Sequence, residues 1–181
     1  MQKLIFGTTN ENKLQEASQI LGLPVEGIKL DVPEIQTLDQ LKIATYKAKG
    51  YYQQLHTPLF VEDTGLIFHA LNGLPGAYTS DFSKALGNDG LFKLLKSFSN
   101  YSATAQTILV FIDEKGETHH FEGSIEGTIT SPIGDQGFGW DPIFIPSGHT
   151  QTFAQMNSED KNKFSMRRLA FEKFKIFLDS N

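Results

Sequence analysis

The stretch that decides the fold is Leu59 to Phe68, which reads Leu-Phe-Val-Glu-Asp-Thr-Gly-Leu-Ile-Phe. Its apolar residues predict a buried strand, and Glu62 and Asp63 interrupt them with two adjacent carboxylates. Because successive side chains of a strand point to opposite faces, only one of the pair can face a given cleft. We expect the pair at the strand end, where Gly65 lets the chain bend. An ordinary acidic turn is the alternative.

Length and composition predict one domain over residues 1–181, located in the cytoplasm. The chain has no cysteine, which excludes disulfides and thiolate metal sites and fits a reducing compartment. Its first residues indicate a strand rather than a signal peptide, and no apolar stretch approaches the ~20 residues of a membrane span. The formal charge of -5 argues against binding to nucleic acid, because phosphate backbones attract clustered lysine and arginine.

Strands and helices alternate along most of the chain, as in α/β proteins whose sites collect at strand ends. Apolar periodicity predicts strands at 3–6, 25–30, 59–68 and 143–145, and an antiparallel hairpin of strands at 103–111 and 118–129. It also predicts helices. One is capped by Asn10, a second packs through Leu41 to Leu55, and a third packs through Leu91, Leu94, Leu95 and Phe98. A last helical region begins near a Ser158 cap and buries Phe174.

The turn from Gly7 to Lys13 joins a strand to a helix and is rich in hydroxyl groups. Free backbone N–H groups and the helix dipole favour anions at such a turn, and Lys13 adds a positive charge. The spacing is not that of a Walker loop. A capped helix start without a ligand is therefore the alternative to a phosphate site.

Glu34, Lys47 and the pair of His119 and His120 are further polar residues that could form a site. Glu34 follows the second strand and Lys47 lies on the next helix, and each alone would be an ordinary surface charge. His119 and His120 are adjacent on the returning hairpin strand, but no third ligand occurs at a matching spacing. We therefore do not expect zinc there.

The loop from Gly137 to Pro142 alternates glycine with aromatic residues and ends in an acid. If it exposes Phe138 and Trp140 beside Asp141, it could stack a planar base and read its edge. The alternative is that these aromatic residues pack in the core.

Taken in order, these motifs resemble the inosine triphosphate pyrophosphatase family over nearly the whole chain. The motifs are Thr8-Thr9-Asn10-Glu11-Asn12-Lys13, Pro33-Glu34, Val61-Glu62-Asp63-Thr64-Gly65, Gly73-Leu74-Pro75-Gly76, Phe138-Gly139-Trp140-Asp141 and Lys161-Asn162. The resemblance implies an elongated α/β fold with a long mixed sheet flanked by helices, and two lobes around a nucleotide-binding cleft. It also implies a homodimer and a Mg²⁺-dependent, house-cleaning hydrolysis of ITP, dITP and XTP to the monophosphate and pyrophosphate.

The resemblance further implies roles for individual residues. The implied metal ligands are Glu34 and Asp63, and Asp63 would also accept the proton, a role that Glu62 or Glu34 could share. The implied substrate-binding residues are Thr8, Asn10, Lys13, Lys47, Thr64, Phe138, Gly139, Trp140, Asp141, Lys161 and Arg167.

Three positions depart from the family pattern. Thr9 replaces a common glycine in the phosphate turn, Met166 stands where the family usually has histidine, and Ser80 stands where some members carry a basic residue. Two other functions would use some of the same features. A related fold hydrolyses pyrimidine triphosphates, but the Phe-Gly-Trp-Asp loop disfavours it. A non-catalytic nucleotide sensor would not need both Glu34 and Asp63.

Overall fold

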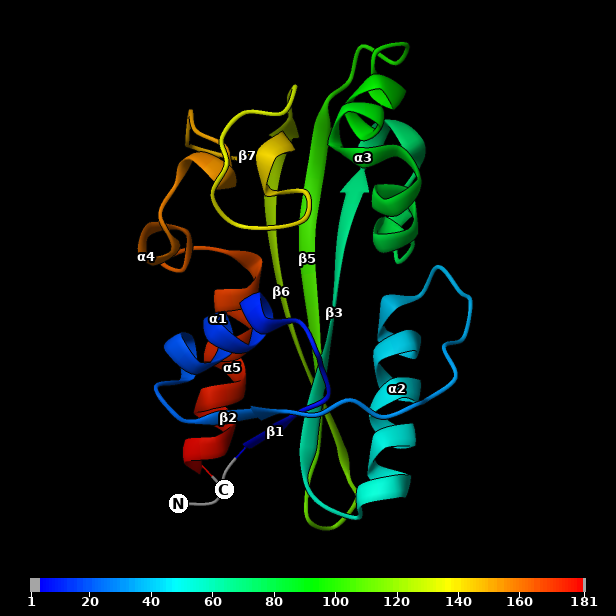
Figure 1. Cartoon of the computed structure of the whole chain (residues 1–181), viewed down its shortest axis with the longest axis vertical. Coiled ribbons are helices and arrows are strands. Elements are labelled where there is room, and N and C mark those ends of the chain that lie inside the picture. Colours follow the sequence, from blue (N-terminus) through cyan, green and yellow to red (C-terminus); the bar gives the residue numbers. More distant parts are fainter. Residues whose placement is uncertain (1–3, 181) are drawn as a thin grey trace.

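A long mixed sheet forms the centre of the computed structural model, which describes residues 4–180 (Figure 1). Within these residues, seven strands take the order β2-β1-β3-β5-β6-β7, and β4 pairs with β3. β1 is parallel to β2 and β3, and the other pairs are antiparallel. The strands are β1 Leu4–Phe6, β2 Val25–Gly27, β3 Leu59–Phe68, β4 Pro75–Gly76, β5 Ser102–Ile112, β6 Thr118–Ile129 and β7 Phe144–Pro146. The expected elongated α/β fold is confirmed.

Helices cover both faces of this sheet (Figure 1). Helices α1 and α5 pack on one face, α2 packs on the other, and α3 lies beside the upper part of the sheet. The helices are α1 Glu11–Leu21, α2 Gln40–Leu55, α3 Thr79–Leu95, α4 Ser158–Lys161 and α5 Met166–Ser180, with 3₁₀ turns at His69–Leu71, Asp141–Ile143 and Phe153–Gln155. None of the helices in residues 4–180 is long and apolar enough to cross a membrane.

The two-residue period of β3 divides its side chains between these two layers. Phe60 packs with the phenylalanines of α5, whereas Leu59 and Val61 pack with α2. By the same alternation Glu62 points toward α5 and Asp63 toward α2. Their hydrogen bonds, to Arg167 and Gln40 respectively, confirm that the two carboxylates face opposite sides.

The expected strand end at Glu62 and Asp63 is wrong, because β3 continues through them to Phe68. What ends there is the neighbouring strand: the last residue of β1 pairs with Phe60, and β4 rejoins the edge only at Leu66. The edge of β3 between these points is open, which creates the space for a site. Gly65 does not bend the chain; it provides room, because a Cβ there would lie 2.5 Å from the Gln40 Nε2 atom.

Some element boundaries also differ from the sequence prediction. β2 ends at Gly27, and β7 begins one residue later than expected. Phe98 is 49% exposed and does not belong to the apolar face of α3, because that helix ends at Leu95. Asn157, not Ser158, caps α4, since its side chain accepts the backbone N–H three residues on.

The aromatic packing of α5 predicts a large cost for truncating Phe174. Its ring lies 5.3 Å from that of Phe60 and 5.1 Å from that of Phe111, and the side chain is fully buried. We expect Phe174→Ala to lower the free energy of unfolding by about 3–5 kcal/mol. The matched control is Ile176→Ala, on the same helix but 66% exposed, which should cost less than about 0.5 kcal/mol. Equal losses in urea unfolding would contradict this packing.

Candidate active site

A cavity of about 630 Å³ opens beside the free edge of β3. Its walls come from the turn before α1, the segment after β2, helices α2 and α3, the loop before β7 and the start of α5 (Figure 1). Glu34 lines it, and so do all of the substrate-binding residues that the sequence predicted: Thr8, Asn10, Lys13, Lys47, Thr64, Phe138, Gly139, Trp140, Asp141, Lys161 and Arg167. Asp63 is not part of the lining and lies in the wall behind it.

The turn before α1 is ordered by its own polar side chains. Thr8 Oγ1 accepts the backbone N–H of Asn10 at 3.2 Å, and Asn10 Oδ1 accepts that of Lys13 at 3.1 Å. The positive end of the helix dipole therefore points at the cavity. The Lys13 ammonium reaches back to Glu62, with Nζ 3.0 Å from Oε1. Lys13 thus forms an ion pair with Glu62 and also lines the cavity.

Arg167 and Lys161 join this pair to the base of the cavity. Arg167 is 1% exposed and donates its Nε and NH2 groups to the two oxygens of Glu62 at 2.9 and 2.8 Å. Its NH1 group donates to Glu16. Lys161 Nζ lies 3.1 Å from the other oxygen of Glu16 and 2.6 Å from Asp141 Oδ2. With Lys13, these residues form a six-residue ion network of three cations and three carboxylates.

The pKa values of Glu62 and Asp141 are shifted in opposite directions, because Glu62 has two cation partners and Asp141 has one. Burial acts to raise the pKa of Glu62, but the charges of Arg167 and Lys13 outweigh it and hold the pKa at about 2. Burial likewise raises the pKa of Asp141, and here Lys161, which Glu16 shares, does not outweigh it. Glu62 is therefore the firmly ionised member.

On the α2 side, Asp63 and Lys47 form the other charged wall. Asp63 Oδ2 accepts a 2.9 Å hydrogen bond from the buried Gln40 side chain. Burial raises the pKa of Asp63, although Gln40, Lys13 and Lys47 act in the opposite direction. Burial also lowers the pKa of Lys47, against the charges of Glu34 and Asp63. Lys47, Glu34 and Asp63 therefore influence one another electrostatically.

The aromatic loop only partly matches the expectation of two exposed rings. Trp140 is 7% exposed and packs edge-on against Phe144, so it contributes to the core as well as to the cavity wall. Phe138 is half-buried, and its ring lies beneath two cations: Lys161 Nζ is 4.8 Å and Arg167 Cζ 5.6 Å from the ring centre.

Two glycines with positive φ shape this loop. Gly137 and Gly139 have φ values of 71° and 65°, which residues with a side chain rarely adopt. The resulting turn lets the N–H of Phe138 donate to Asp141 Oδ2 at 2.9 Å. Asn88 of α3 donates to the carbonyl of Gly139 at 3.0 Å, which links the loop to the opposite wall.

Comparison with known proteins identifies this architecture. A family model described as the Ham1 family matches residues 4–177. The chain belongs to the Ham1 family. Among relatives, the dITP/XTP pyrophosphatase of Methanopyrus kandleri is 40% identical over 99% of this chain and 97% of its own length. The inosine triphosphate pyrophosphatase of Yarrowia lipolytica is 43% identical over 97% of this chain and 95% of its own.

Solved structures of the Ham1 family share the fold. The Ham1 protein of Staphylococcus aureus superposes with a TM-score of 0.86 at 26% identity, covering 99% of both chains. A HAM1 protein from Coxiella burnetii gives the same TM-score at 27% identity and covers 100% of both chains. The elongated sheet and its helical layers are therefore those of the family.

Two polar residues in the site of this Ham1 family member were not predicted from the sequence. Glu16 joins Arg167 to Lys161, and Gln40 holds Asp63. A signal for Glu16 existed, because it lies four residues before Ile20, on the buried face of α1. A carboxylate on an apolar helix face needs a buried partner. Gln40 had no such signal, since its partner lies on a strand 23 residues away.

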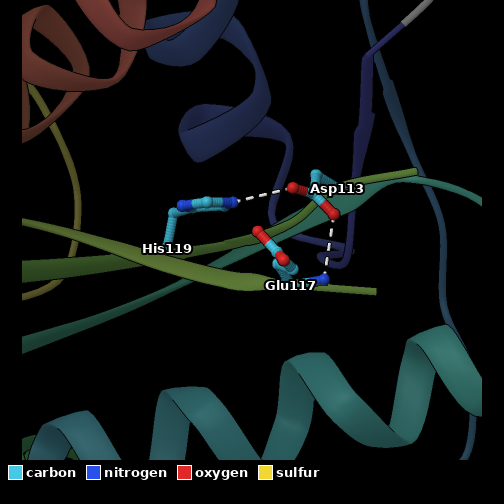
Figure 2. A group of neighbouring side chains, drawn as sticks. All are labelled: Asp113, Glu117 and His119. Atoms are coloured by element: carbon cyan, nitrogen blue, oxygen red, sulfur yellow. Dashed lines mark hydrogen bonds and ion pairs between the residues drawn. The ribbon is translucent and has the colours of Figure 1, made fainter. Parts of the chain in front are cut away.

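A second polar group lies at the hairpin turn between β5 and β6, outside the cavity. Figure 2 shows the side chains of Asp113, Glu117 and His119. Their possible ligand atoms lie within 4.8 Å of one another. The group contains His119 but not His120, and its other two members come from the turn. However, Asp113 Oδ2 already pairs with His119 Nε2 at 2.9 Å, and Oδ1 accepts two backbone N–H groups. This group could hold a cation, but its contacts are those of an ion pair that closes the hairpin.

The ion network predicts that Arg167→Met destabilises this Ham1 protein strongly. The change leaves Glu62 and Glu16 buried with one cation each, and breaking a buried pair costs about 3–5 kcal/mol. The matched control is the neighbouring Arg168→Met, which removes a partly exposed pair with Glu172 and should cost less than about 1 kcal/mol. Urea unfolding at neutral pH measures both. A loss in Arg167→Met no larger than in the control would rule out the network as a stabilising element.

Proposed function

We propose that this Ham1 family member is a Mg²⁺-dependent nucleoside triphosphate diphosphatase. It would hydrolyse ITP, dITP and XTP to the monophosphate and pyrophosphate and so remove non-canonical purines from the nucleotide pool. One observation carries the proposal: a helix start, several lysines, the carboxylates of Glu34 and Asp141 and an aromatic loop all surround one cavity of about 630 Å³. The names of relatives that match nearly the whole chain support it.

The loop provides groups suited to a 6-keto purine. The half-buried ring of Phe138 offers a surface on which a base can stack. The backbone N–H groups of Gly139 and Trp140 have no acceptor within residues 4–180. A keto oxygen can accept hydrogen bonds from these N–H groups. The amino group of adenine is itself a donor and would leave them unpaired.

Glu34 and Asp63 fit the proposed magnesium site. Within the described residues Glu34 makes no hydrogen bond or ion pair, and Asp63 uses only Oδ2. Carboxylate oxygens therefore remain available, and Mg²⁺ is usually held by one or two carboxylates together with phosphate and water. When bound, the ion would neutralise charge on the phosphates.

Asp63 is the residue best suited to orient and deprotonate the attacking water. Its burial raises its pKa, which makes it a stronger base than an exposed aspartate. Glu62 is a poor base, since Arg167 holds both its oxygens and its pKa is about 2. Water would attack the α-phosphorus, the proton would pass to Asp63, and pyrophosphate would leave. The proposal includes the homodimer that the resemblance implies and the cytoplasmic location that the composition predicts.

A nucleotide panel tests this function. Purified protein is mixed with ITP, dITP, XTP, ATP, GTP and CTP, with and without Mg²⁺, and pyrophosphate release is measured. We expect the 6-keto non-canonical purines to be preferred and chelation of Mg²⁺ to stop turnover. Preferred hydrolysis of a pyrimidine nucleotide, or release of monophosphate instead of pyrophosphate, would overturn the proposal.

Asp63→Asn should abolish most turnover while nucleotide binding persists. The amide fills the same space but cannot accept the proton, and losing a catalytic base typically lowers kcat ~10²- to 10⁴-fold. Asp81→Asn, at an exposed site on α3 outside the cavity, is the control. A kcat for Asp63→Asn within about threefold of wild type would assign the base to Glu34.

Met166→His should sharpen discrimination against ATP. Met166 lines the cavity and is 2% exposed, and a thioether gives a base only apolar surface and a weak acceptor. A buried hydrogen-bond donor there is worth about 1–3 kcal/mol, so the ratio of kcat/KM for ITP over ATP should rise roughly tenfold. Met156→His, in the same apolar cluster but outside the cavity, is the control. An unchanged ratio would mean that residue 166 does not read the base.

A further inference from the structure

The cations that line the cavity fall into two groups. Lys13, Lys161 and Arg167 belong to the ion network, where three carboxylates already balance them. The other cations that line it are Lys29, Lys47 and Lys84. They are therefore the ones whose charge the network does not neutralise.

Two of these three lysines have no counter-charge of their own. Lys47 lies within the influence of Glu34 and Asp63. Lys29 and Lys84 are exposed, and neither makes an ion pair or a side-chain hydrogen bond within residues 4–180. We call them the unpaired lysines. A surface lysine usually remains free in water, but these two line the same cavity as the network.

The unpaired lysines come from different walls of the cavity. Lys29 lies in the segment between β2 and α2, and Lys84 lies in α3 before the break at Gly87 (Figure 1). The wall that carries Lys84 is held in place: Thr79 donates to the carbonyl of Gly76 at 2.6 Å. The Asn88 side chain ties the same helix to the aromatic loop. On the other wall, the backbone N–H groups on either side of Lys29 donate to the Phe6 carbonyl at 2.9 Å and to the Tyr51 hydroxyl at 3.3 Å. Both lysines are thus flexible side chains on anchored backbone.

The charge balance shows why a phosphate chain would need them. The net charge of the network is zero. Outside it, the three positive charges of Lys29, Lys47 and Lys84 exceed the two negative charges of Glu34 and Asp63 by one. A nucleoside triphosphate brings about four negative charges, of which a bound Mg²⁺ offsets about two. Cations that are not already paired are the ones whose full charge can offset the remainder.

We propose that Lys29 and Lys84 bind the two terminal phosphates of the substrate from different walls of the cavity. The inference rests on the proposed function and deepens it. The aromatic loop and Asp63 would hold the base and the α-phosphate, so the exposed lysines are left for the distal phosphates. These carry the most charge and form the leaving pyrophosphate.

Lys29→Gln, Lys84→Gln and the double variant test this assignment. Glutamine keeps most of the length of the side chain and removes the charge. Because the lysines would grip the phosphates in the ground and transition states alike, KM for ITP should rise about tenfold in each single variant, with kcat within about twofold of wild type. The double variant should show the larger rise, and raised salt should weaken kcat/KM less in it than in wild type.

Two exposed lysines outside the cavity serve as matched controls: Lys93→Gln on α3 and Lys49→Gln on α2. Product inhibition gives a second readout. The inhibition constant of pyrophosphate should rise with KM in the variants of the unpaired lysines, whereas that of the nucleoside monophosphate should not change. If all three cavity variants match the controls in KM, or if inhibition by the monophosphate weakens as much as that by pyrophosphate, the assignment is wrong.

Binding of inorganic tripolyphosphate, measured by calorimetry with Mg²⁺, separates this inference from the proposed function. If the wild-type protein binds tripolyphosphate and the double variant binds it at least about tenfold more weakly, the lysines bind phosphate even if no nucleotide is hydrolysed. If the wild-type protein hydrolyses ITP but the double variant binds tripolyphosphate as wild type does, the proposed function stands and this inference falls.

Discussion

The bidentate pair between Arg167 and Glu62 is the interaction on which the rest of the site depends. It joins α5 to the middle of β3, and both side chains are buried. Removing two charges from water is costly, and the pair is stable only because Lys13 and Glu16 supply further opposite charges. The buried pair therefore fixes the positions of α1 and α5 relative to the sheet.

The alternation of side chains along β3 places Glu62 and Asp63 in different environments. Glu62 faces the layer of α1 and α5, where two cations keep its pKa low and use both its oxygens. Asp63 faces α2, where burial raises its pKa and Gln40 uses only one oxygen. Two adjacent carboxylates thus acquire different properties from the same backbone. One is suited to hold the fold together, and the other retains the capacity to bind a cation or a proton.

A balanced network also has a consequence for binding. Because Lys13, Lys161 and Arg167 already have carboxylate partners, they are held in place before any ligand arrives. The same pairing reduces the net charge that they can offer to a phosphate. The cavity thus combines neutralised groups with exposed lysines that make no ion pair within residues 4–180.

The sequence by itself determined the sheet and helix layers and the set of residues around the cavity. Apolar periodicity revealed β3 and the hairpin, and the motifs identified the residues that line one pocket. These signals are local, because the spacing of apolar residues within one stretch of sequence indicates whether it forms a helix or a strand. The order and spacing of the motifs also indicated the family to which the chain belongs.

Only the tertiary structure decided how those residues are paired. It placed Glu62 and Asp63 in mid-strand beside the end of β1, and it buried Trp140. It also recruited Glu16 and Gln40, whose partners are far away in sequence. The physical reason is that burial and charge pairing depend on which elements meet in space. A pattern within one element cannot show which side chain of another will neutralise it.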